Sequence, residues 1–104
     1  MKTYRELYFR GTEEQLKKFV KYFKEYSEGD WSVERQTERW KDYLFIDYIG
    51  DEVEKARVSI FTGDRLESGE LKVGNIVPLE KSQLTIDEYN SVLMKFYNDV
   101  IKPF

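Results

Sequence analysis

The segment DYLFIDYIG, residues 42–50, places apolar side chains on both faces of one predicted β-strand. Because side chains alternate along a strand, one face carries Leu44, Ile46 and Tyr48. The opposite face carries Tyr43, Phe45, Asp47 and Ile49. A strand of this kind predicts the centre of a sheet, with the core on one face and a second cover on the other. That cover could be residues 31–40, a second copy of the chain or a partner.

Four further segments are predicted to be strands. They are residues 3–10, 31–40, 56–63 and 71–80. Together with residues 42–50 they make five predicted strands. Within the last of them, Gly74 predicts a bulge, and Pro78 places that point at a strand end or sheet edge. The segment WSVERQTERW, residues 31–40, also contains helix-favouring residues. We interpret it as a strand, because a hairpin turning at Lys41–Asp42 gives residues 42–50 a neighbour.

Two helices are predicted from their first turns. A Thr-x-x-Gln capping box at Thr12 opens a helix over residues 13–27, and a Thr-x-x-Glu box at Thr85 opens a helix that ends before Pro103. The resulting order is β-α-β-β-β-β-α, which predicts a single α+β domain over residues 1–104. We expect a two-layer sandwich of a mainly antiparallel, four- to five-stranded sheet with both helices on one face.

The residue types narrow the chemistry that we expect. The chain has no cysteine and no histidine, so a disulfide, a zinc–sulfur site and the commonest general base are all excluded. We therefore expect no metal, no cofactor and no enzymatic activity. The formal net charge of −3 disfavours binding to nucleic acid. No apolar run has the length of a signal peptide or a membrane span, so we expect an acidic cytoplasmic protein without a membrane partner.

The leading functional hypothesis is a small protein-binding module that uses the second face of the sheet. Its partner would be another protein or, as a homodimer, a second copy, and immunity proteins and antitoxins offer an analogy of size and charge only. The predicted contact residues are aromatic or lie beside aromatic ones: Trp31, Trp40, Tyr43, Phe45, Asp47, Ile49 and Phe61. A small-molecule pocket between the sheet and the C-terminal helix is a further option.

Two other functions stay open at this stage. Asp64, Glu70 and Lys72 have the order of the acidic and basic residues of metal-dependent nucleases, which predicts a phosphodiesterase as an alternative. The second alternative is nucleic-acid binding by a basic helix face that contains Lys17 and Lys21. Both patterns are short and are also typical of solvated turns and helix surfaces.

Overall fold

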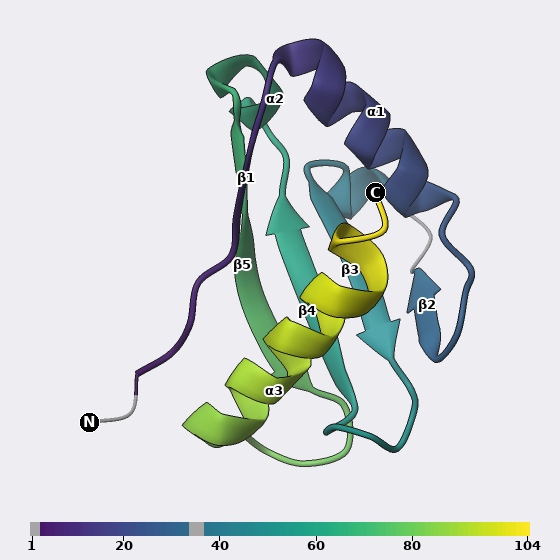
Figure 1. Cartoon of the computed structure of the whole chain (residues 1–104), viewed down its shortest axis with the longest axis vertical. Helices are drawn as coiled ribbons and strands as arrows, with labels where there is room; N and C mark the ends of the chain where they lie inside the picture. The colour runs from purple at the N-terminus through teal and green to yellow at the C-terminus, as the bar shows by residue number, and fades with distance from the viewer. Residues whose placement is uncertain (1–2, 34–36) are drawn as a thin grey trace.

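Five strands form one antiparallel sheet in the computed structural model, which describes residues 3–33 and 37–104 (Figure 1). The order across the sheet is β1-β5-β4-β3-β2. The strands are β1 (Tyr8–Arg10), β2 (Trp31–Val33), β3 (Tyr43–Tyr48), β4 (Ala56–Phe61) and β5 (Glu70–Pro78). The expected α+β class and antiparallel sheet are therefore confirmed, with β3 and β4 inside the sheet rather than at its edges.

The two longer helices begin at the predicted capping boxes. They are α1 (Glu13–Lys24) and α3 (Ile86–Phe96), and α3 continues as a π-helical turn, η2 (Tyr97–Ile101). In the first box the Thr12 hydroxyl accepts from the Gln15 N–H at 3.1 Å, and Gln15 Oε1 accepts from the Thr12 N–H at 2.8 Å. The box at Thr85 is closed in the same way. Each box satisfies backbone donors that a helix start would otherwise leave unpaired.

Both α1 and α3 lie over the same face of the sheet, in front of it in Figure 1. Their apolar sides meet in the core, where the Phe23 and Phe96 rings lie 6.3 Å apart and both side chains are fully buried. Two tyrosines also connect this region to the C-terminal turn: the hydroxyl of Tyr22 in α1 donates to the carbonyl of Val100, and the hydroxyl of Tyr26, just after α1, donates to the carbonyl of Asp99 at 2.9 Å. Within the described part of the chain, no helix has the length and apolar character that crossing a membrane requires.

Residues 31–40 differ from the expected strand. Only Trp31–Val33 is a strand, residues 34–36 lie outside the described residues, and Glu38–Trp40 form a 3₁₀ turn, η1. The expected turn at Lys41–Asp42 is therefore wrong as a tight hairpin, since β2 pairs with β3 through Trp31–Tyr48 and Val33–Ile46.

Three smaller features concern the first strand, the loop before the last strand and the bulge within the last strand. The first strand is confined to Tyr8–Arg10, although the Leu7 carbonyl still accepts from the Val73 N–H at 3.1 Å. A short helix, α2 (Arg65–Ser68), occupies the predicted loop and ends at Gly69, whose φ of 78° suits glycine. The predicted bulge at Gly74 is confirmed by a shift in the β4–β5 register between Ser59 and Ile60.

Candidate functional site

The sheet face that lies opposite α1 and α3 is the candidate site. We call it the open face, and its side chains come from Tyr43, Phe45, Asp47, Arg57, Ser59, Phe61, Asn75 and Val77. The alternation of β3 and β4 produces it, because every second residue of these strands is buried beneath the helices and the residues between them are partly exposed. This is the second apolar face predicted from residues 42–50.

Four aromatic rings cluster on the open face. Tyr43 and Phe61 are cross-strand partners with ring centroids 5.2 Å apart, and the Phe45 ring lies parallel to that of Tyr43 at 5.9 Å. Trp40, from η1, meets Tyr43 and Phe45 edge-on at 5.7 and 5.8 Å. Trp40 thus covers part of this face, yet Trp40 itself remains 42% exposed.

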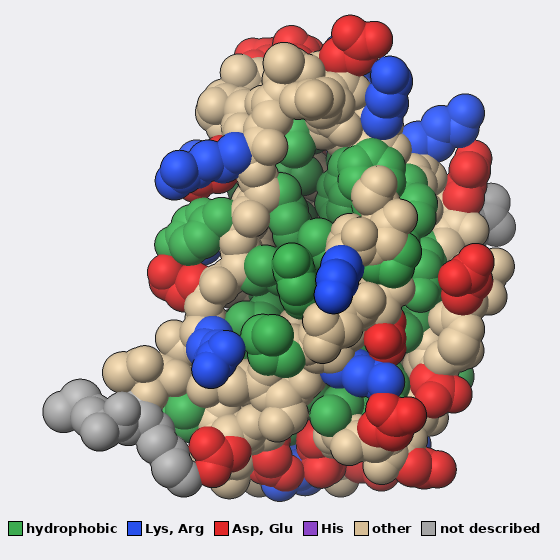
Figure 2. Space-filling view, viewed as in Figure 1, with side chains coloured by type: hydrophobic (Ala, Val, Ile, Leu, Met, Phe, Trp, Pro, Cys, Tyr) green, Lys and Arg blue, Asp and Glu red, His purple; other side chains and the backbone are tan. Residues whose placement is uncertain are grey.

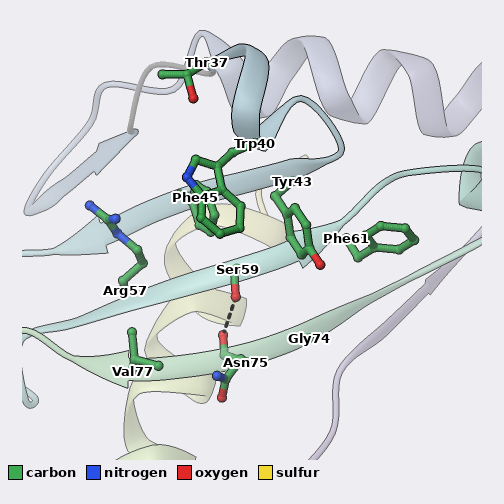
Figure 3. Close-up of a pocket in the computed structure, with 10 residues that line it drawn as sticks. All are labelled: Thr37, Trp40, Tyr43, Phe45, Arg57, Ser59, Phe61, Gly74, Asn75 and Val77. Atoms are coloured by element: carbon green, nitrogen blue, oxygen red, sulfur yellow. Dashed lines mark hydrogen bonds between the residues drawn. The ribbon is translucent and has the colours of Figure 1, made fainter. Parts of the chain in front are cut away.

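A wide, shallow hollow of about 810 Å³ lies beside these rings (Figure 3). Its floor consists of small or flat groups, because the bulge places both Gly74 and Asn75 opposite Ser59. The Ser59 hydroxyl donates to the Asn75 carbonyl at 3.2 Å, so the floor is hydrogen-bonded within the sheet. Thr37 and Trp40 form one wall of the hollow, and Val77 lies at the opposite side.

Asp47 is the acid that the sequence places among apolar residues, and Arg57 satisfies it. Arg57 lies directly across the β3–β4 pair and donates two hydrogen bonds to the Asp47 carboxylate, at 2.7 and 2.9 Å. The Asp47 side chain is only 16% exposed, so this charged partner offsets a substantial desolvation cost. The Arg57 guanidinium also lies 5.4 Å from the centroid of the Phe45 ring.

A second hollow, of about 370 Å³, continues the open face toward β1. It is lined by Tyr8, Phe61, Arg65, Glu70, Lys72 and Gly74. The Tyr8 hydroxyl donates to Glu6 at 2.6 Å, and this hydrogen bond raises the pKa of Tyr8. The Glu70 carboxylate, which lines this hollow, accepts a hydrogen bond from Arg10 at 2.9 Å and forms an ion pair with it.

The three residues that resemble a nuclease motif, Asp64, Glu70 and Lys72, do not all lie in this hollow. Glu70 and Lys72 line it, but Asp64 lies outside the lining, in the turn before α2. Glu70 is paired with Arg10, and the Lys72 ammonium lies 5.7 Å from the Tyr8 ring centroid. Over residues 3–33 and 37–104, no three acidic side chains gather closely enough to hold a metal ion.

The remaining predicted residues lie elsewhere. Trp31 points into the core, where it is 4% exposed and donates from Nε1 to Asp99 at 3.0 Å, so it does not contribute to the open face. Ile49 follows the end of β3 and is 56% exposed. Lys17 and Lys21 lie on the exposed side of α1, where Lys17 pairs with Glu13 at 3.2 Å.

Arg57 is a residue of the candidate site that the sequence did not predict. A symmetric hairpin centred on the Gly50–Asp51–Glu52 turn would place position 55 opposite position 47, whereas the structure pairs Arg57 with Asp47. Strand alternation puts position 57 on the same face as position 47, but the turn alone does not specify that the two residues are partners.

A separate apolar hollow of about 320 Å³ lies on the helix side. Its apolar lining consists of Phe9, Leu16, Phe19, Ile101 and Phe104. Figure 2 shows hydrophobic side chains gathered in this region, between β1, α1 and the end of the chain. Its lining comes from β1, α1 and the end of the chain, so it differs from the pocket between the sheet and the C-terminal helix that was considered from the sequence. Its volume is less than half that of the hollow on the open face.

Comparison with known proteins adds no relative. No protein-family model matches the sequence, and neither the curated proteins nor the solved structures give a significant match. Function is therefore inferred from the side chains of the open face.

Proposed function

We propose that this protein is a non-enzymatic binding module that recognises another protein through the open face. The observation that supports the proposal is the cluster of Trp40, Tyr43, Phe45 and Phe61 around a hollow on the sheet face that α1 and α3 leave uncovered. Aromatic side chains are enriched at protein interfaces because they bury a large area at a small cost in side-chain entropy. The rings would anchor the partner, and the polar residues around them would form the rim.

The shape of the hollow favours a broad partner over a small ligand. Pockets for small molecules enclose most of the ligand surface, whereas this hollow is open along the sheet. Its floor of Ser59 and Gly74 would accept apolar side chains that project from a partner surface.

The charged groups of the open face favour binding over catalysis. Among the described residues, Asp47 on the open face is paired with Arg57, and Glu70 in the adjoining hollow is paired with Arg10. Catalysis would need a side chain that is available to a substrate, and both of these carboxylates are already engaged by arginines of the same chain. The sequence contains neither histidine nor cysteine as a replacement.

Site-specific photo-crosslinking in the cells that produce the protein tests this proposal. A photoreactive phenylalanine derivative replaces Val77, which is 41% exposed on the open face, or Met94, which is 37% exposed on α3. The similar exposure makes Met94 a matched control. We expect protein adducts from position 77 and none above background from position 94. Adducts from position 94 alone, or from neither position, would contradict the proposal, and an adduct with the mass of two chains would identify the partner as a second copy.

A further inference from the structure

Four of the aromatic rings along the open face have a cation within about 6 Å of the ring centroid. The pairs are Arg39 over Trp40, Arg57 over Phe45, Arg65 over Phe61 and Lys72 over Tyr8, with the charged group 5.1, 5.4, 5.9 and 5.7 Å from the ring centroid. They come from η1, from β3 and β4, from the start of α2 and from the β1–β5 pair. The aromatic surface is therefore also a basic surface, on a chain whose formal net charge is −3.

Three of these four cations lack a carboxylate partner among residues 3–33 and 37–104. Arg57 is paired with Asp47, whereas Arg39, Arg65 and Lys72 form no ion pair within that part of the chain. The Glu70 carboxylate, which lines the same hollow as Arg65 and Lys72, is paired with Arg10. The cations are held on the face by the rings rather than by acids of the same chain, so they can accept an anionic partner without first breaking an ion pair.

We infer that the partner presents an acidic protein segment, whose carboxylates meet Arg39, Arg65 and Lys72 while its apolar side chains enter the hollow over Ser59 and Gly74. This inference rests on the proposed function. A carboxylate can reach a guanidinium or ammonium from its solvent side while the ring keeps the other side, so both contacts are made together.

The same geometry disfavours two other occupants. Single-stranded nucleic acid binds such sheets by stacking bases on ring faces, but here cations already lie over the faces of the rings. A second copy that docked through the same face would bring its own Arg39, Arg65 and Lys72 against those of the first. Like charges at an interface are repulsive, and an acidic partner removes that repulsion.

The test measures binding of a fluorescein-labelled random copolymer of glutamate and tyrosine to the full chain by anisotropy, at low and moderate salt. The variant Arg39→Gln/Arg65→Gln/Lys72→Gln removes the three cations. Its control, Lys17→Gln/Lys21→Gln/Lys24→Gln, makes the same change in net charge on the exposed side of α1. We expect about a tenfold loss of affinity in the first variant, as three exposed charge pairs would contribute, and little change in the second. We also expect binding to weaken with salt.

Further outcomes separate this inference from the proposed function. Equal losses in the two triple variants, tighter binding of single-stranded poly(U) than of the copolymer, or self-association without copolymer binding would each overturn the inference. If Gly74→Leu, which fills the hollow, weakens binding but the open-face triple variant does not, the open face binds protein and its acidic preference is wrong. If no open-face substitution affects binding of copolymer and position 77 forms no adduct, both the inference and the proposed function fail.

Discussion

Gly74 provides a direct prediction about the open face, because its missing side chain creates space that the fold does not need. A Cβ atom built at Gly74 has the Ser59 carbonyl oxygen at 3.6 Å as its contact, which is an ordinary van der Waals distance. The backbone at Gly74 is not in the left-handed region, in contrast to Gly29 and Gly69. Gly74→Ala is therefore expected to fit without strain.

The expected effect of Gly74→Ala is stabilisation. Glycine within a strand costs about 0.5–1 kcal/mol relative to alanine, since the unfolded chain loses more conformational freedom on folding. For a domain of this size, that gain corresponds to an increase in the midpoint of thermal unfolding of roughly 2–8 °C. Urea denaturation, followed by circular dichroism, measures the same difference in the free energy of unfolding.

Gly69→Ala serves as the control for this experiment. Gly69 has a φ of 78°, and a Cβ there would lie 3.0 Å from the Gly11 carbonyl oxygen. The left-handed conformation alone costs an alanine about 1–2 kcal/mol, so this variant is expected to lose stability. A loss of about 1 kcal/mol or more in Gly74→Ala would refute the reasoning, because it would show that the space above Ser59 is required by the fold.

Two further predictions concern the tryptophans and one acidic residue. Trp31→Ala is expected to lower the free energy of unfolding by about 3–5 kcal/mol because the ring is buried. Trp40→Ala is expected to lower it by less than about 2 kcal/mol because Trp40 is 42% exposed. Equal losses in urea denaturation would contradict the placement of Trp31 in the core and Trp40 at the surface. Hydrogen bonds from Lys81 and from the backbone of Thr85 lower the pKa of Glu88 from 4.5 to about 2. The ionised carboxylate therefore contributes to the free energy of unfolding in full above pH 4.5, and this contribution is lost as the pH falls toward 2. Thermal unfolding at several pH values should therefore show a smaller acid-dependent decrease in Glu88→Gln than in the wild type, and parallel curves would argue against the pairing.

Local patterns were sufficient to predict most of the fold. The alternation in residues 42–50 correctly assigned Leu44, Ile46 and Tyr48 to the core, and all three are buried. The capping boxes at Thr12 and Thr85 located both helix starts, since each box depends only on residues within one turn.

Local patterns could not predict which of the two tryptophans, Trp31 or Trp40, lies in the core. Both bracket the same polar segment, and nothing in their immediate neighbours distinguishes them. Their environments depend on pairing: Trp31 lies opposite Tyr48 and shares its inward face, whereas Trp40 belongs to η1 and packs on the outward rings of β3. A choice between core and surface therefore required the register between β2 and β3, which the chain sets at long range.

The sequence analysis did not place cations beside the aromatic rings, and it considered Lys72 only for a different site. Arg39 and Arg65 lie close in sequence to the rings that they cover, but Lys72 reaches Tyr8 only because β1 pairs with β5 in that register. Net charge over the whole chain also conceals them, since acidic residues elsewhere outweigh them. The identity of the partner stays a prediction.

Cross-linking from position 77, measured with and without Gly74→Leu, tests the central claim most directly. The claim is that the hollow over Ser59 and Gly74 receives a partner protein. We predict that Gly74→Leu removes the adduct from position 77, while the protein stays folded with an unfolding midpoint no lower than that of the wild type and the background at Met94 is unchanged. An adduct of unchanged yield in a folded Gly74→Leu protein would contradict the account, because a filled hollow would then make no difference to binding.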